Sequence, residues 1–208
     1  MRIDLYQDTV CPWCRIGKKN LQLALAQWGG EAEVVYHTFF LNPDVPAEGY
    51  DFRDYLSAKM GVQPQQLASV FDGPTRMGAA VGLEFNFDKI ERSPNSLLSH
   101  RLIALAPADQ REAVIDALYD AYFRDGRDIG DLDTLIAIAA EQGLAADSLR
   151  ARLLTDEAQA AVEAEASHAH ELGITGVPFF IIDQIYAFSG AHLPERMVRV
   201  LQQASQGG

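Results

Sequence analysis

The sequence predicts an α/β fold of β-α-β … β-β-α order, interrupted by a large inserted all-helical domain. The chain is β-prone near its start, in "MRIDLY", and near its end, in "GVPFFIID" and "YAFSG". Between these ends, roughly 120 residues form a series of amphipathic helical segments. Each end alone has too few strands for a stable sheet, so one four-stranded sheet built from both ends is the economical arrangement. We therefore expect one domain from 1–41 with 173–208 and a second, inserted domain from 42–172.

The first 41 residues predict a β-α-β unit. "MRIDLY" reads as the first strand and is followed by the polar residues Gln-Asp-Thr. A helix is expected from Pro12 to Trp28, because proline suits the first helical position and the following Gly29-Gly30 suits a helix end. "EAEVVYHTFFL" is the second strand. It is largely apolar on both faces, which predicts a central strand covered on both sides.

The middle of the chain alternates between helical patterns and Pro or Gly breaks. We expect helices at 51–60, 64–80, 94–106, 109–124, 131–142 and 146–172, the last of them broken near Thr155. "GLEFNFDKI" is predicted to be an extended surface loop. Two strands then follow, separated by a hairpin turn at Asp183-Gln184, and a final helix begins at Leu193 or Pro194.

Composition narrows the classes of partner and the compartment. The chain has 29 acidic and 17 basic residues and a net charge of −12. Such an acidic surface repels nucleic acid and anionic membranes, so neither is expected as a partner. No signal-peptide pattern precedes the first strand, and no apolar run approaches a membrane span. We expect a cytoplasmic protein, and in that compartment a C-x-x-C pair is more often redox-active or metal-binding than a structural disulfide.

The two cysteines of the chain occur together in "DTVCPWCRIGKKN", where the first strand gives way to the helix. In helical register, Cys14 shares a stripe with Gly17 and Leu21, which places Cys14 on the buried face. Cys11 precedes the first turn and is expected at the exposed helix mouth. Residues three apart on a helix are neighbours, so the two sulfur atoms are within reach of one another.

This position predicts different chemical roles for the two cysteines. A helix N-terminus offers unpaired N–H groups and partial positive charge, which favour a thiolate. In C-x-x-C motifs the cysteine pKa falls to roughly 3.5–7.5. We predict that Cys11 attacks a disulfide and that Cys14 resolves the mixed disulfide. Pro12 fixes the first turn, Trp13 offers an apolar surface beside the sulfur, and no metal or organic cofactor is needed.

Three other interpretations of the cysteine pair stay open. The spacing could arise by chance. A zinc site needs four ligands, but the chain has no second C-x-x-C, and His168 and His170, two apart on a helix, point in different directions. The third interpretation is a pair of inert buried thiols, because free cysteine often behaves as a small hydrophobic residue.

Four segments together carry a family resemblance. "CPWCRIG", "PNSLLSHRLIALA", "GVPFFIID" and "FSGAH" resemble the FrnE-like dithiol oxidoreductases. These belong to the DsbA-like branch of the thioredoxin superfamily and are related to 2-hydroxychromene-2-carboxylate isomerases. The resemblance covers nearly the whole chain, and the cysteine motif is its most specific part. It implies a thioredoxin-like fold with an inserted helical domain and a redox-active Cys11–Cys14 disulfide.

The resemblance also implies roles for four further residues. The residue matching Pro178 has a cis peptide bond and faces the dithiol, and the backbone of Val177 would pair with the substrate chain. The alternative is that Pro178 is simply a proline at the first position of a strand. Asn95 and His100 would face the active-site groove. The alternative for His100 is a half-buried helix histidine with a local hydrogen bond.

The proton acceptor for Cys14 is left open by the sequence. Many thioredoxin-like proteins place an acid six residues before the first cysteine, where this chain has Leu5. Asp4 is one residue away and would point to the opposite face of the strand. Asp8 is nearer the motif, but a helix-capping role is the simpler interpretation there. Water or a shifted Asp4 stays possible as the acceptor.

These observations predict a thiol–disulfide oxidoreductase or disulfide isomerase that acts on peptides or small disulfides. A thiol such as glutathione is a possible reductant. The first rival is a glutathione-dependent isomerase or transferase of the same fold, although a second cysteine at position 14 argues against it. The second rival is a redox-sensing binding module in which the dithiol only switches a surface.

Overall fold

The computed structural model describes residues 1–206, and the chain divides into two compact units. The sheet unit comprises Met1–Leu41 with Glu165–Gly208, and the helical unit comprises Asn42–Ala164. The predicted domain ranges, 1–41 with 173–208 and 42–172, stay a prediction, and residues 207–208 lie outside the described part. Within residues 1–206, no helix combines the length and apolar character needed to cross a membrane.

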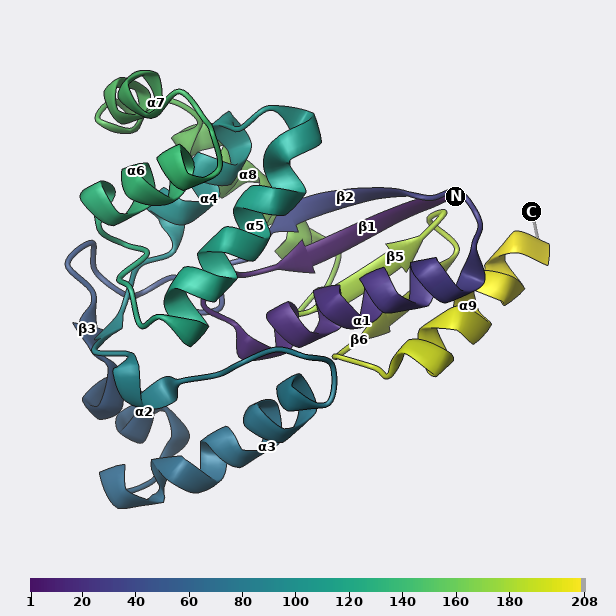
Figure 1. Cartoon of the computed structure of the whole chain (residues 1–208), viewed down its shortest axis with the longest axis horizontal. Helices are drawn as coiled ribbons and strands as arrows, with labels where there is room; N and C mark the ends of the chain where they lie inside the picture. Colours follow the sequence, from purple (N-terminus) through teal and green to yellow (C-terminus); the bar gives the residue numbers. More distant parts are fainter. Residues whose placement is uncertain (207–208) are drawn as a thin grey trace. The chain divides into compact units, whose positions relative to one another are not determined.

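The sheet unit contains one four-stranded sheet with the strand order β2-β1-β5-β6. Its strands are β1 (Arg2–Gln7), β2 (Glu33–Thr38), β5 (Phe179–Ile182) and β6 (Tyr186–Ser189). β1 pairs with β2 in parallel, whereas β5 runs antiparallel to both β1 and β6. Helices α1 (Pro12–Trp28) and α9 (Pro194–Gln206) lie side by side along one face of the sheet (Figure 1). The predicted α/β fold, with its β-α-β and β-β-α halves, is confirmed.

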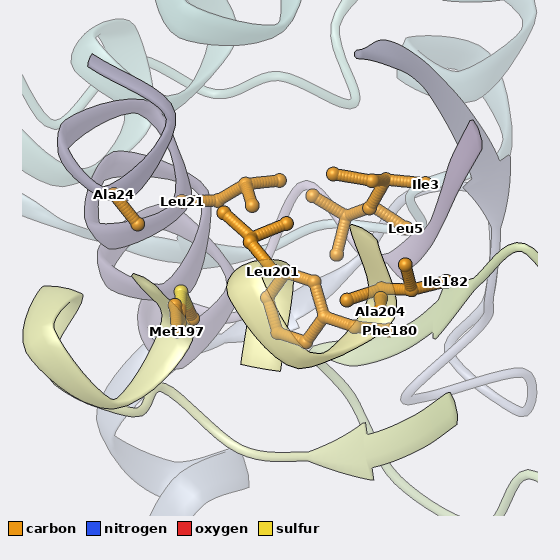
Figure 2. Close-up of a cluster of buried hydrophobic side chains, with 9 residues drawn as sticks. All are labelled: Ile3, Leu5, Leu21, Ala24, Phe180, Ile182, Met197, Leu201 and Ala204. Carbon is orange, nitrogen blue, oxygen red and sulfur yellow. The ribbon is translucent and has the colours of Figure 1, made fainter. Parts of the chain in front are cut away.

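The core of the sheet unit fills the space between this face and the two helices. Figure 2 shows its buried side chains pointing toward one another from α1, α9, β1 and β5: Ile3, Leu5, Leu21, Ala24, Phe180, Ile182, Met197, Leu201 and Ala204. A fully buried Leu, Ile, Phe or Met side chain contributes about 1.5–3 kcal/mol. Because Ile3 and Leu5 face α1, the alternation along β1 turns Asp4 and Tyr6 to the other face. This packing fixes α1, and so its two cysteines, relative to the sheet.

The prediction that the second strand is central was wrong, because β2 is an edge strand beside β1. Both of its faces are covered even so. Val34 and Tyr36 pack against the core below α1. On the edge, the carboxylate of Glu165, from α8 (Gln159–Glu171), accepts a hydrogen bond from the backbone N–H of Thr38 at 2.9 Å. An exposed edge strand is prone to pair with a strand of another chain. The contact with Glu165 occupies one backbone N–H that would otherwise be open to such pairing.

The helical unit contains the predicted series of helices. They are α2 (Phe52–Met60), α3 (Leu67–Ala79), α4 (Leu97–Leu105), α5 (Arg111–Tyr119), α6 (Leu132–Glu141) and α7 (Ala146–Leu153). A small two-stranded ladder joins β3 (Tyr50–Asp51) to β4 (Arg92–Ser93). The predicted break near Thr155 is confirmed, because α7 ends at Leu153 and α8 begins at Gln159. The buried Arg101 holds this break by donating to the carbonyl oxygens of Arg152, Thr155 and Glu157.

The segment "GLEFNFDKI" is not the surface loop that its sequence predicted. Phe85 and Phe87 are buried, and their rings are stacked 5.4 Å apart. Phe87 also stacks on Phe71 of α3 at 4.3 Å, and Phe85 contacts Phe123 at 5.3 Å. Aromatic pairs at such distances gain energy beyond simple burial. The segment is therefore part of the core of the helical unit, and it ends in a short 3-10 helix at Phe87–Lys89.

Candidate active site

The dithiol lies where the chain enters α1. Cys11 is the N-cap residue, in an extended conformation with φ −98° and ψ 112°, and Pro12 is the first helical residue. The carbonyl oxygen of Cys11 accepts from the N–H of Cys14 at 3.1 Å and from that of Arg15 at 3.4 Å. These bonds form the first turn of the helix and fix the spacing of the two cysteines. Both cysteines are free thiols in this structure.

The prediction that Cys11 lies exposed at the helix mouth was wrong. Cys11 is 2% exposed and Cys14 is 0% exposed. The Sγ atom of Cys11 lies 3.7 Å from the carbonyl oxygen of Val177, to which the thiol donates. Val177 is far away in sequence, so the helical register gave no sign of this cover. The stripe that placed Cys14 on the buried face did indicate its environment, since Gly17, Leu21 and Ala24 are buried with it.

The environment of Cys14 holds it in the protonated form. Burial raises the pKa of Cys14 well above the usual value of 9.0, and a hydrogen bond to Cys11 and the charge of Cys11 raise it further. The backbone of Asp8 hydrogen-bonds the sulfur and acts in the opposite direction, whereas the charge of Asp8 again raises the pKa. A thiol that donates to a neighbouring sulfur stabilises negative charge on that neighbour. The two cysteines are therefore chemically unequal.

The segment before β5 covers the dithiol. The peptide bond between Val177 and Pro178 is cis, and Pro178 is buried. The Pro178 ring lies so close to α1 that a Cβ on Gly17 would be 2.7 Å from its Cγ. The Pro178 carbonyl oxygen accepts from the N–H of Gly190 at 2.8 Å, which ties the segment to the end of β6. Gly17 is thus required where the helix and the proline meet.

A cavity of about 300 Å³ adjoins this segment. It is lined by residues of the 173–179 segment, including Val177 and Pro178, and by Ser189 and Gly190. None of the lining residues is charged. Trp13 is 37% exposed, which leaves its indole available to a second molecule. Among residues 1–206, no group of three or more His, Cys, Asp or Glu side chains is arranged to hold a metal ion.

Asn95 and His100 lie in the helical unit. The Asn95 amide donates to the carbonyl oxygen of Val45 at 2.6 Å, and its oxygen accepts from the N–H of Leu97 at 2.9 Å. Asn95 therefore ties a loop to the start of α4. His100 is 2% exposed, more buried than the half-buried histidine considered above. The role of these two residues in a groove stays a prediction.

Asp4 is not positioned to serve Cys14. As the alternation along β1 predicted, its side chain lies on the face opposite α1. Its carboxylate binds Arg2 at 2.7 Å and the Nε2 atom of His37 at 2.8 Å. Burial raises the pKa of Asp4, but the hydrogen bonds from Arg2 and His37 outweigh this and lower it below 3.8. The acid near the dithiol is instead Asp8, which is 0% exposed.

Asp8 is not a helix cap, contrary to the simpler interpretation of its sequence position. The N-cap is Cys11, and no side chain caps the helix there. The Oδ2 atom of Asp8 accepts from the N–H of Leu41 at 2.7 Å, and Oδ1 accepts from the N–H of Val10 at 3.4 Å. The signal in the sequence was an acid three residues before Cys11. Only the fold reveals that its carboxylate is buried.

His37, in β2, joins an ionic network with two carboxylates. Its Nδ1 atom lies 2.9 Å from Glu165, and its Nε2 atom lies 2.8 Å from Asp4. Burial lowers the pKa of His37, but the hydrogen bonds and charges of Glu165 and Asp4 outweigh it and raise the pKa above 6.5. The ring also stacks on Tyr6, with centroids 4.6 Å apart. The network joins α8 to β1 and β2.

The contribution of His37 to stability is expected to depend on pH. Because the folded pKa is raised, this contribution is present below about pH 6.5 and is lost as the pH rises through the folded pKa. We expect His37→Gln to lower the free energy of unfolding by about 1.5–3 kcal/mol at pH 6, the range for hydrogen bonds to charged groups, and by less at pH 9. Urea denaturation at both pH values measures this. An equal loss at both values would contradict the prediction.

Comparison with known proteins extends the observations on the dithiol and the sheet. The family model of the DSBA-like thioredoxin domain matches residues 2–202. A crystal structure of a probable DsbA oxidoreductase from Streptomyces coelicolor has a TM-score of 0.92 and 33% identity, covering 100% of this chain and 91% of that one. The uncharacterized protein YwbO of Bacillus subtilis (strain 168) is 28% identical over 187 residues, 88% of this chain and 86% of YwbO.

A more distant structure shares the fold. The cytosolic disulfide reductase DsbM from Pseudomonas aeruginosa has a TM-score of 0.70 and 20% identity, and the match covers 100% of both chains. In its structure with GSH the TM-score is 0.68, the identity 17%, and the coverage 99% of this chain and 100% of DsbM. At this identity the likeness concerns the fold alone. The model match over 2–202 and the 33% identity to the Streptomyces protein are more specific, and they show that this chain belongs to the DSBA-like thioredoxin domain family.

Proposed function

We propose that this protein is a thiol–disulfide oxidoreductase in which Cys11 attacks a substrate disulfide and Cys14 resolves the mixed disulfide. The observation that carries the proposal is the inequality of the two thiols. Cys14 is fully buried, has a raised pKa and hydrogen-bonds Cys11. Cys11 lies at the N-cap of α1, where unpaired N–H groups and the helix dipole favour an anion. Cys11 is therefore the attacking thiol in this proposal. Cys14 stays protonated until it resolves the mixed disulfide in the second step.

The substrate is proposed to bind along the segment that contains Val177 and Pro178. In the reduced form the Cys11 thiol donates to the Val177 carbonyl oxygen at 3.7 Å. A thiolate has no proton to donate, so ionisation of Cys11 would release this carbonyl as an acceptor for a substrate N–H. Addition of an extended chain to exposed backbone is a common mode of peptide recognition. The exposed indole of Trp13 would contact the same substrate.

The substrate class follows from the surroundings of Val177. The adjoining cavity of about 300 Å³ is lined by uncharged residues, which suits an uncharged peptide segment or a small disulfide. Glutathione is proposed as the reductant that returns the disulfide to the dithiol. The structure of DsbM with GSH is a precedent for this ligand on the same fold.

The proposed order of the two steps predicts a trapped intermediate. Cys14→Ser keeps the attacking thiol but removes the resolving one. With glutathione disulfide, we expect this variant to accumulate a mixed disulfide at Cys11, seen in intact mass spectrometry as one added glutathionyl group. The matched variant Cys11→Ser is expected to gain none, because Cys14 is buried and protonated. An adduct on Cys14 in that variant would refute the assigned roles, and the absence of any adduct in both would refute the function.

A further inference from the structure

The ionic network of His37 holds α8 to the sheet through both oxygens of one carboxylate. Glu165 of α8 binds the Nδ1 atom of His37 at 2.9 Å with Oε1 and accepts from the N–H of Thr38 at 2.9 Å with Oε2. The Nε2 atom of His37 binds Asp4 of β1 at 2.8 Å. The side chains of His37 and Asp4 are only 16% and 9% exposed, so solvent screens their interaction little. The network therefore fixes α8 against the end of β2.

The helix α8 leads directly into the segment that covers the dithiol. Ala169 lies one turn after Glu165 on the same face of α8 and is fully buried. The N–H of Ile174 donates to the carbonyl oxygen of Ala169 at 3.0 Å, where the helix ends. Val177 follows shortly after, and its carbonyl oxygen accepts from the Cys11 thiol at 3.7 Å. The position of α8 therefore bears on the position of Val177.

One apolar cluster links α8, the sheet and the same segment. Its buried members are Tyr6, Phe39, Ala169 and Ile174. Val177 packs against this cluster, and the ring of Tyr6 stacks on that of His37 with centroids 4.6 Å apart. The ionic network thus borders the cluster that supports Val177. Because protein interiors are close-packed and transmit strain, a shift of α8 at Glu165 would also displace Val177.

We propose that His37 and Glu165 are positioning residues for the substrate-binding segment at Val177, an assignment that rests on the proposed function. Their ion pair holds α8 against β2, and α8 holds the Val177 carbonyl oxygen where a substrate chain would pair with it. Loss of the pair would weaken substrate binding, because the pairing backbone moves. It would also make Cys11 react faster with a small reagent, because the thiol loses its cover and an acceptor that favours its protonated form.

Two variants remove the ion pair with opposite changes of charge. At pH 6, His37→Gln removes a positive charge and Glu165→Ala removes a negative one, so a change common to both comes from the lost pair and not from the electric field. The probe is the disulfide-linked dimer of the capped tripeptide Ala-Cys-Ala, mixed with the reduced protein in single-turnover experiments. In each variant we expect the half-saturating peptide concentration to rise about fivefold, within the range for one net hydrogen bond, and the limiting rate to change less than about twofold.

Alkylation of Cys11 by iodoacetamide gives the second reading. Peptide mapping follows its rate at pH 6, and we expect it to be about threefold faster in both variants than in the unaltered protein. The matched control is His168→Gln, which removes an exposed histidine of the same helix that lies 3.4 Å from Glu171. An exposed pair of this kind contributes little, so the control should leave both readings within about twofold of the unaltered protein.

The effect of His37→Gln is expected to depend on pH. The titratable groups around His37 are Asp4 and Tyr6 of β1 and Glu165 of α8, and Asp4 also binds Arg2. Burial lowers the pKa of His37, but Glu165 and Asp4 outweigh it and raise the pKa above 6.5, so the ion pair is present at pH 6 and weakened at pH 9. The ratio of half-saturating concentrations, variant to unaltered, should therefore fall from about fivefold at pH 6 to about twofold or less at pH 9.

The outcomes distinguish this assignment from the proposed function. Half-saturating concentrations that are unchanged in both variants, that change in opposite directions, or whose ratio is the same at both pH values would overturn the positioning role and leave the function standing. No reduction of the peptide disulfide by the unaltered protein would refute the function and this assignment together. If His37→Gln does not fold, Glu165→Ala still decides, because loss of a charge alone would not weaken the binding of an uncharged peptide.

Discussion

Cys11→Ala is expected to abolish turnover of disulfide substrates, with a loss of roughly a thousandfold or more, the scale seen when an enzyme loses its nucleophile. The remaining thiol, Cys14, cannot replace it, because burial raises the pKa of Cys14 well above its usual value and holds this thiol protonated. Reduction of insulin by glutathione or dithiothreitol, followed by turbidity, measures the effect. The fold should be retained, because cysteine to alanine removes a single sulfur atom.

Cys14→Ala is the matched variant for this experiment. It removes the neighbouring thiol of the same helix turn but leaves the attacking group, so its reaction should stop after one step. We expect one equivalent of mixed disulfide from Cys14→Ala and none from Cys11→Ala. Insulin reduction by Cys11→Ala at a rate near that of the unaltered protein would end the proposal that Cys11 is the nucleophile.

Gly17→Ala is expected to harm both stability and activity, although alanine favours helices by about 1 kcal/mol over glycine. The new Cβ would lie 2.7 Å from the Cγ atom and 3.3 Å from the Cβ atom of Pro178, and a closed proline ring can move these atoms only slightly, by changing its pucker. Overpacking of this kind costs about 1–3 kcal/mol. Moving Pro178 also moves Val177, whose carbonyl oxygen contacts Cys11. We expect activity to fall by about ten- to a hundredfold, as for a catalytic group misplaced by about 1 Å.

Ala26→Gly isolates the helix propensity in this comparison. Ala26 is exposed on the same helix, so the change should cost about 1 kcal/mol of unfolding free energy and leave turnover unaltered. Urea denaturation and the insulin assay on both variants give the two readings. If Gly17→Ala were more stable than the unaltered protein and fully active, the close contact between α1 and Pro178 would matter for neither stability nor activity, contrary to this prediction.

The prediction from sequence was most accurate where structure depends on near neighbours. The bounds of α1 were predicted to the residue, because Pro12 and Gly29 mark a helix start and a helix end. The turn at Asp183 and Gln184 was recognised, and both residues have the positive φ that such a turn requires, 47° and 57°. The break between α7 and α8 was likewise expected. The hydrogen bonds by which Arg101 holds this break were not.

The sequence was less informative about which faces of an element are covered. The apolar character of β2 predicted a central strand, yet a strand at the edge has the same pattern when a helix contacts it. Phe85 and Phe87 alternate with polar residues, and this pattern does not distinguish a surface loop from a connecting segment that is buried in the core. The sequence did not indicate the ionic network of His37, because its two carboxylate partners come from different elements, Asp4 in β1 and Glu165 in α8.

The sequence by itself determined the order of the elements, the place of the cysteines at the start of α1 and the burial of Cys14. These depend on periodicity and capping, which act over a few residues. Only the tertiary structure decided that Cys11 is covered and that Asp8, not Asp4, lies beside the dithiol. Cys11 meets Val177 across 166 residues, and Asp8 meets Leu41 across 33. Contacts over such separations arise when the sheet and its helices pack together, and no local pattern contains them.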